Sequence, residues 1–231
     1  MFQRRFALLP EALLIGLLGV LMTTKALNSG LALYIHPRYH LLLAVVGALL
    51  TLLGLARLAI GREPIPGRML LLPALVVLCL VVVPARPLGA SLASAKSLNS
   101  QSNADLIARL EGSRSNDTSE WTLLEWTAAL RSEGVTALQG KPVRFEGFVF
   151  RTDDLPAEAV FVGRYLVTCC TADGRALALA VRTATPAAFA TDQWVRVEGT
   201  LNVAEIDGEM VPMVDGTLTP IDPPKVPYLY P

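Results

Sequence analysis

Two adjacent cysteines, Cys169 and Cys170, are the residues whose types and spacing most directly suggest chemistry. Two thiolates on one bulge of a strand could hold a soft metal ion such as zinc or copper(I). Zinc takes four ligands, so the others would have to come from a partner protein or from Asp153, Asp154 or Asp173. The alternative is structural: neighbouring strand residues point to opposite faces, which would put one cysteine in the core and one near the rim.

Both histidines of the chain, His36 and His40, lie four residues apart in a short turn. As metal ligands at this spacing they would share one helix, which Pro37 between them opposes. We therefore expect a turn at a membrane interface, where the rings of Tyr34 and Tyr39 are well placed. A metal or proton role for the two histidines is the alternative.

The other residue patterns that enzymes use are missing from the sequence. It has no Gly-rich phosphate loop and no Gly-x-Ser-x-Gly motif, and no histidine follows His40. Without a histidine, the C-terminal part cannot build a Ser-His-Asp or Cys-His site. The third cysteine, Cys79, lies in an apolar run and is expected to act as a small apolar residue. The sequence therefore predicts a protein that is not an enzyme.

The net charge of zero over 231 residues conceals two different halves. Residues 1–90 carry eight Lys/Arg and two Asp/Glu, a balance of +6, whereas residues 91–231 carry twelve and eighteen, a balance of −6. With 52% hydrophobic and 17% charged residues, the chain is too apolar for disorder or for an ordinary soluble domain. An acidic C-terminal half lacks the basic face that nucleic-acid binding needs, so no nucleic-acid partner is expected.

Three long apolar runs in residues 1–90 predict a transmembrane domain in a lipid bilayer, with spans near 8–30, 41–60 and 68–85. A bilayer core of about 30 Å needs about 20 helical residues, and snorkelling arginines such as Arg57 would extend the shorter runs. The alternatives, a buried helical core or a cleaved signal peptide, leave apolar runs uncovered.

The basic residues that flank the predicted spans favour one orientation. Five of them lie on the side of the N-terminus and three on the other side. By the positive-inside rule, the N-terminus is then cytoplasmic and the C-terminal domain extracytoplasmic.

Residues 91–118 are rich in Ser, Asn and Ala and predict a flexible linker. The sequence Asp117-Thr118-Ser119-Glu120 resembles a capping box, and large apolar residues follow at roughly helical spacing. We expect a short amphipathic helix near 119–132, at the start of an α+β domain that spans residues 119–231.

From about residue 140 the apolar pattern has period two, which is typical of strands. The turns Asp173-Gly174 and Asp207-Gly208 predict hairpins, and Gly147 and Gly199 within strands indicate bends. Five or six short strands with such bends predict a small antiparallel β-barrel of the OB-like type. The expected strands lie near 143–150, 165–170, 176–182, 194–201 with its continuation 201–206, 209–214 and 217–221.

Five blocks of sequence, in this order and spacing, carry a resemblance to a known family. The blocks are Tyr34-Ile35-His36-Pro37-Arg38, Gly140-Lys141-Pro142-Val143 with Gly147-Phe148-Val149, the run Arg164 to Asp173 (RYLVTCCTAD), Trp194 to Thr200 (WVRVEGT), and Pro227-Tyr228-Leu229-Tyr230-Pro231. The chain resembles the YcgQ-like family of bacterial membrane proteins, whose genes usually stand beside that of a multi-span permease. The family has Ala where this chain has Gly174, which indicates a tighter turn here.

The resemblance implies a two-subunit complex in the bacterial cell membrane, with this chain as the uncharacterised subunit beside a permease. It also implies a link to metal homeostasis, and to zinc in particular, which supports Cys169 and Cys170 as metal-handling residues. We therefore expect an accessory subunit for transport of a cation. The alternative is a membrane-anchored thiol oxidoreductase or metallochaperone that uses the same two cysteines.

Overall fold

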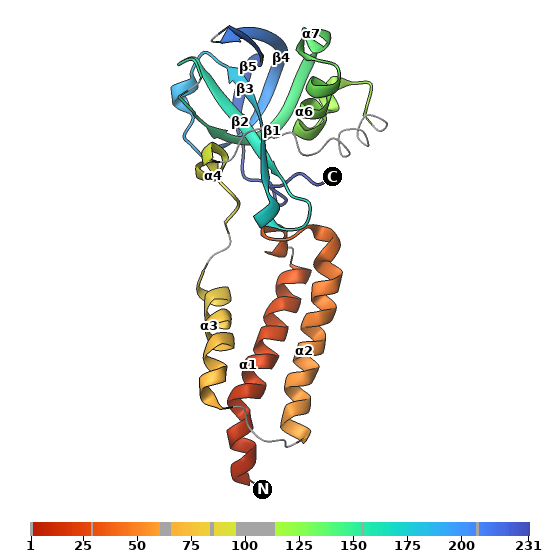
Figure 1. The fold of residues 1–231 in the computed structure, drawn as a ribbon, viewed down its shortest axis with the longest axis vertical. Coiled ribbons are helices and arrows are strands. Elements are labelled where there is room, and N and C mark those ends of the chain that lie inside the picture. Colours follow the sequence, from red (N-terminus) through yellow and green to blue (C-terminus); the bar gives the residue numbers. More distant parts are fainter. Residues whose placement is uncertain are drawn as a thin grey trace. The chain divides into compact units, whose positions relative to one another are not determined.

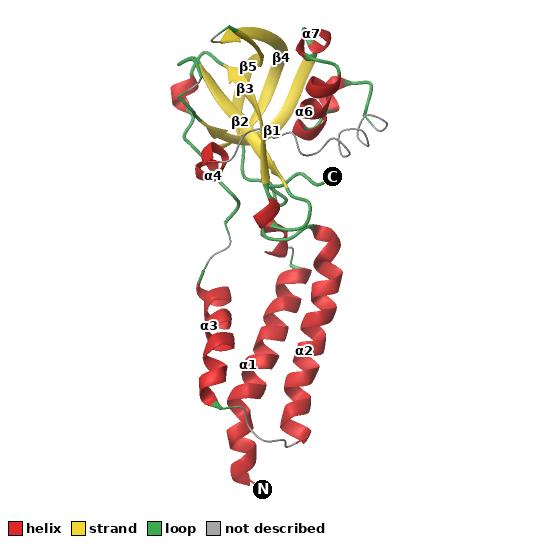
Figure 2. Cartoon of the chain, viewed as in Figure 1, coloured by secondary structure: helices red, strands yellow, loops and turns green. Residues whose placement is uncertain are grey.

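The chain folds into two compact units, Met1–Pro87 and Leu88–Pro231. Figures 1 and 2 show that the first unit is helical and that the strands belong to the second. The division lies near residue 90, where the sequence changes from basic to acidic. The computed structural model describes residues 2–28, 30–60, 66–83, 86–95, 114–153, 155–206 and 208–231.

The first unit contains three apolar helices: α1 (Phe2–Leu27), α2 (His40–Ile60) and α3 (Gly67–Val82). Two stretches, Leu9–Leu27 and Pro37–Ile60, are long and apolar enough to cross a membrane. Leu9–Leu27 falls within the first predicted span, 8–30, whereas Pro37–Ile60 contains the second, 41–60, and begins four residues before it.

The third predicted span, 68–85, is not confirmed. Its helix α3 has 16 residues, and the backbone becomes extended at Val83. At 1.5 Å per residue, such a helix is shorter than the bilayer core of about 30 Å. The first span also ends earlier than the predicted residue 30, because α1 stops at Leu27 and the short 3-10 helix η1 (Gly30–Leu33) follows.

Small residues allow α1 and α2 to approach closely. Gly19 of α1 is buried, and a Cβ atom there would lie 2.5 Å from both the carbonyl oxygen of Gly47 and the amide nitrogen of Thr51. Helices in lipid gain no hydrophobic energy from meeting each other, so close packing of small residues is what holds them together. Gly19 and Gly47 are therefore the tightest points of this helix pair.

An ion pair also joins the two helices. Arg57 Nε donates to Glu11 Oε1 at 2.5 Å, and its Nη2 contacts the same oxygen. Glu11 is 1% exposed, and a carboxylate in such surroundings is costly unless it is paired. Arg57 thus reaches the opposite helix rather than extending α2 toward the interface by snorkelling, as the sequence alone suggested.

We expect Gly19→Ala to destabilise the α1–α2 pair by about 1–3 kcal/mol, because the added methyl group meets backbone that cannot move aside cheaply. SDS-induced unfolding of the full chain in detergent micelles measures this effect. Gly16→Ala is the matched control on the same helix, since a Cβ atom at Gly16 meets nothing within 4 Å. Equal stability of the two variants would contradict the packing account.

Five strands of the second unit close into a barrel in the order β1-β2-β3-β5-β4. They are β1 (Pro142–Phe150), β2 (Ala159–Leu166), β3 (Arg175–Arg182), β4 (Trp194–Ile206) and β5 (Glu209–Pro220). The predicted small barrel is confirmed. The expectation that it is antiparallel throughout is wrong, because β3 and β5 pair in parallel. A closed ring with an odd number of strands cannot alternate direction all the way round.

The strands β4 and β5 are longer than predicted, at 13 and 12 residues. The sequence indicated breaks near residues 201 and 215, but the chain stays paired through both points. Gly199 and Gly216 stand opposite each other, and a Cβ atom on either would collide with the backbone of the other strand. Paired glycines therefore let a long hairpin continue where the pattern suggested separate strands.

The barrel interior is continuous with the buried face of helix α6 (Leu123–Ser132). Trp126 and Ala129 of α6 are fully buried and belong to the same core as Val149 and Leu201 of the barrel. In Figure 1, α6 and the short α7 (Val135–Leu138) lie on one side of the barrel.

The capping box stands five residues later than predicted. Asp117 caps only the 3-10 helix η3 (Thr118–Glu120), by accepting the Ser119 amide at 2.9 Å. The capping box of α6 is formed by Thr122 and Glu125.

A second cluster of buried residues covers part of the outer face of the barrel. Phe148, Tyr165 and Trp194 project from the strands, and Ala90 and Ala93 of helix α4 (Ala90–Ala95) pack on them. The structure here differs from the predicted flexible linker 91–118, whose first residues are docked on the barrel. Residues 96–113 of that linker lie outside the described residues.

Candidate functional site

The cysteine loop (residues 168–174) joins β2 to β3 and contains both candidate thiols. Its conformation is set by Asp173, whose Oδ1 accepts the Thr168 amide at 3.0 Å and whose Oδ2 accepts the Cys169 amide at 2.7 Å. A 3-10 turn, η4 (Thr171–Asp173), brings this carboxylate back to the start of the loop. The sequence predicted a two-residue hairpin turn at this point, and the loop is longer because the turn precedes Gly174.

Asp173 is held as a carboxylate. Partial burial by itself would raise its pKa, but amide hydrogen bonds from Thr168 and Cys169 act together in the opposite direction and lower it below the ordinary value. Hydrogen bonds donated to a carboxylate favour its charged form. The carboxylate is therefore engaged in holding the loop.

The thiol of Cys169 is exposed, and its pKa is raised to about 11. The largest cause is its hydrogen bond with Cys170, followed by that with Asp173. At neutral pH this sulfur therefore carries its proton, whereas the attacking species in thiol chemistry is the thiolate. The thiolate is also the form that binds metal ions, so at neutral pH either use of Cys169 requires that it lose its proton.

The two cysteines of the loop are free and adjacent, with Cys170 half-buried. Cys79 lies in α3, in the other unit, and is also free. The structure therefore brings together Cys169, Cys170 and Asp173, as the sequence suggested.

A complete metal site is not formed by the described residues. Among them, no group of three or more His, Cys, Asp or Glu side chains is arranged to hold a metal ion. Asp153 is exposed on the loop between β1 and β2, and Asp154 lies outside the described residues. A zinc ion at the two thiols would thus need ligands from outside the described part of this chain.

The two histidines lie in the first unit. His36 precedes the 3-10 helix η2 (Pro37–Tyr39), and its Nδ1 accepts the Arg38 amide at 3.1 Å. His40 is the first residue of α2. The two histidines therefore belong to different elements, on either side of Pro37. A shared helical site for both histidines is not present.

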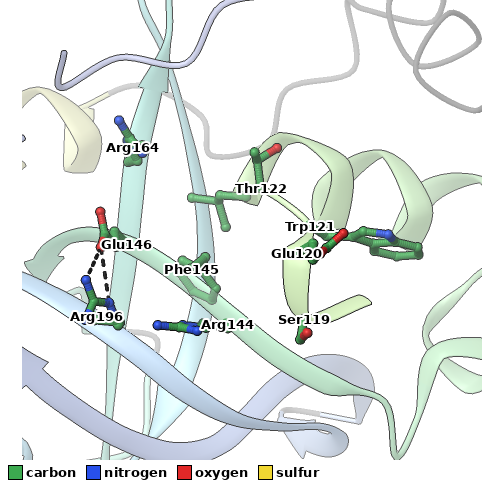
Figure 3. Close-up of a pocket in the computed structure, with 10 residues that line it drawn as sticks. Ser119, Glu120, Trp121, Thr122, Arg144, Phe145, Glu146, Arg164 and Arg196 are labelled. Atoms are coloured by element: carbon green, nitrogen blue, oxygen red, sulfur yellow. Dashed lines mark hydrogen bonds and ion pairs between the residues drawn. The ribbon is translucent and has the colours of Figure 1, made fainter. Parts of the chain in front are cut away.

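A groove of about 400 Å³, which the sequence did not reveal, lies where the N-terminal end of α6 meets the outer face of the barrel (Figure 3). Arg196 donates to Glu146 Oε1 at 2.7 and 3.1 Å, and Arg144 pairs with Glu198 at 3.2 Å. These residues are cross-strand neighbours on β1 and β4. The sequence shows alternating charges in both strands, but these charges can be assigned to pairs only once the strand register is known.

The charged side chains that line the groove are held by other residues of the second unit. Arg164, at its edge, donates to two backbone carbonyls and lies over the ring of Trp194. Burial lowers the pKa of Arg164, and no histidine or cysteine lines the groove. Among its other charged side chains, Glu146 pairs with Arg196, Arg144 pairs with Glu198, and Glu120 accepts the Ser115 hydroxyl.

We expect Cys170→Ala to lower the pKa of Cys169 from about 11 toward the ordinary 9.0, and Asp173→Ala to lower it by a smaller amount. Each change removes one of the hydrogen bonds that hold the proton on Cys169, because the alanine side chain neither donates nor accepts. The pH dependence of iodoacetamide alkylation at Cys169, resolved by mass spectrometry in a Cys79→Ser background, measures this pKa. Asp222→Asn removes an exposed carboxylate that does not affect Cys169 and serves as the control. An unchanged midpoint in both loop variants would refute the assignment.

Residues 99–231 match the family model described as the DUF1980 C-terminal domain. The match covers the barrel and α6 and does not extend into the apolar helices α1, α2 and α3. No curated protein and no solved structure matches the sequence.

Proposed function

We propose, for a chain that belongs to the DUF1980 C-terminal domain family, a non-enzymatic role as the membrane accessory subunit of a multi-span permease. Within this family, the sequence blocks described above support membership in the YcgQ-like group. In this role the helices hold the chain beside the permease, and the barrel receives a cation, with zinc as the first candidate.

The membrane location is supported by the two helices long and apolar enough to span a bilayer. The distribution of basic residues favours a cytoplasmic N-terminus and an extracytoplasmic barrel in a bacterial cell membrane. The described residues of these helices offer little for conduction, since Glu11 is already paired with Arg57. Ion pathways normally show intramembrane polar groups, so the path itself is assigned to the partner.

The barrel supports a binding role. Its strand order, with β3 and β5 as the parallel pair, fits an OB-like barrel, an architecture used for ligand and partner recognition. Residues 91–231 carry a net charge of −6, and the field of an acidic domain concentrates cations rather than nucleic acids. An accessory subunit that captures or delivers a cation needs no catalytic residues.

The observation that carries the proposal is the incomplete ligand set of the cysteine loop. Two adjacent thiols and a carboxylate are gathered in one loop, and one thiol is exposed. Zinc binding would release protons from the thiols, and the remaining ligands would come from the permease. A site shared between two subunits suits transfer of an ion better than permanent storage.

The test is zinc uptake by proteoliposomes that contain the full chain together with the multi-span membrane protein that co-purifies with it. We expect uptake of radioactive zinc to need both proteins and to fall at least about tenfold in Cys169→Ser or Cys170→Ser, because two-ligand capture is lost; tenfold corresponds to about 1.4 kcal/mol. Cys79→Ser, which removes the thiol outside the loop, is the matched control and should leave uptake unchanged.

Full zinc uptake by the partner alone would eliminate the accessory role. Uptake that needs both proteins but is indifferent to the loop cysteines would keep the accessory role and exclude the loop as the zinc site.

A further inference from the structure

The tail (residues 226–230) adds a further strand-like pairing to the edge of β2. Leu229 forms a parallel bridge with Leu166, donating to the Tyr165 carbonyl at 2.8 Å and accepting the Val167 amide at 3.0 Å. β1 pairs with β2 only from Phe148 to Phe150, so the last residues of β2 have an edge that β1 does not cover. The tail fills that edge.

Arg164 fastens the tail to the barrel. Its Nε donates to the Pro227 carbonyl at 3.2 Å and its Nη2 to the Val226 carbonyl at 2.8 Å. The guanidinium carbon lies 5.6 Å from the centre of the Trp194 ring. The tail is therefore fixed by backbone and side-chain contacts together.

The strap (residues 88–93), which follows the helical unit in the chain, lies on the same part of the barrel. The Leu88 amide donates to the Tyr228 hydroxyl at 3.0 Å, so the strap is bonded to the tail. The Tyr165 hydroxyl donates to the Gly89 carbonyl at 2.8 Å, which bonds the strap to β2. Ala90 and Ala93 are buried against the aromatic residues of the barrel.

The strap and the tail hold the two ends of the cysteine loop. Val167, which the tail binds, immediately precedes the loop. At the other end, a Cβ atom added to Gly174 would lie 2.9 Å from Leu88 Cδ1, so the strap closely covers the last residue of the loop. The loop cannot change its path without disturbing one of these contacts.

We propose that the strap and the tail couple the cysteine loop to the segment that joins the barrel to the membrane helices. A ligand that bridges the two thiols must draw Cys169 away from Asp173 and reshape the loop, and this loosens the strap. Coupling between sites is reciprocal, so a firmly docked strap lowers the affinity of the loop for that ligand by the same factor. The inference rests on the proposed function, in which this loop is the one that receives the ligand.

The test uses the full chain in detergent micelles in a Cys79→Ser background, with phenylarsine oxide as the bridging ligand. Two As–S bonds form, the As–O bond breaks, and both thiol protons leave in water, so no oxidant or reductant is needed. Hydrogen exchange of the peptides that cover the strap and the tail is compared with and without the arsenical. We expect exchange there to rise at least about fivefold, the lower end of typical coupling.

Two variants sharpen the measurement. Cys169→Ser leaves a single thiol that cannot be bridged, so the arsenical should produce no rise in exchange. Tyr228→Phe keeps the ring but removes the hydroxyl that accepts a hydrogen bond from the Leu88 amide, so it should loosen the strap. A looser strap should in turn increase the affinity for the arsenical.

Bridging of the thiols with unchanged exchange in the strap and the tail would overturn the coupling. Equal arsenical affinity of Tyr228→Phe and the parent would overturn it as well. Neither result involves the permease or zinc uptake, so either would leave the proposed function standing. Conversely, a failure to observe zinc uptake would not change the hydrogen exchange that is expected with the arsenical.

Discussion

The division of β1 between two partners is the constraint on which the second unit depends. A ring of five strands cannot alternate direction throughout, so one parallel seam must exist, and here it joins β3 and β5. β1 closes the ring by pairing with β4 over most of its length and with β2 only at its end. The remaining edge of β2 would otherwise present unpaired backbone groups, which are costly when buried. The tail satisfies that edge and thereby determines where the cysteine loop begins.

Much of the second unit could be predicted from local patterns. Period-two alternation revealed the strands, and glycines within strands indicated a small barrel. The parallel seam, the bridge of the tail and the docked strap could not be predicted, because they join residues far apart in the chain. The contact between Leu88 and Tyr228, for example, spans 140 positions. The sequence also misplaced the capping box, since both Asp117 and Thr122 have acidic residues three positions later, and only the fold selects Thr122.

The candidate site could also be predicted in part from the sequence. Adjacent cysteines followed by an aspartate can be found by inspection, and the structure does gather Cys169, Cys170 and Asp173. The protonation of Cys169 and Asp173 could not be predicted from the sequence, since their pKa values depend on hydrogen bonds within the loop. In the apolar helices of the first unit, Glu11 and Arg57 were visible as two isolated charges, but 46 residues separate them, and only the packing of α1 on α2 makes them partners.

The long sequence separation between the strap and the tail also bears on folding. A contact between residues this far apart carries a higher loop-closure cost than the strand pairs of the barrel, so we expect the bond between Leu88 and Tyr228 to form after the barrel strands have paired. Until then the strap does not cover Gly174 at the end of the cysteine loop. The contacts that border the cysteine loop in the native state are thus among the last to form, and Cys169 stays exposed after they have formed.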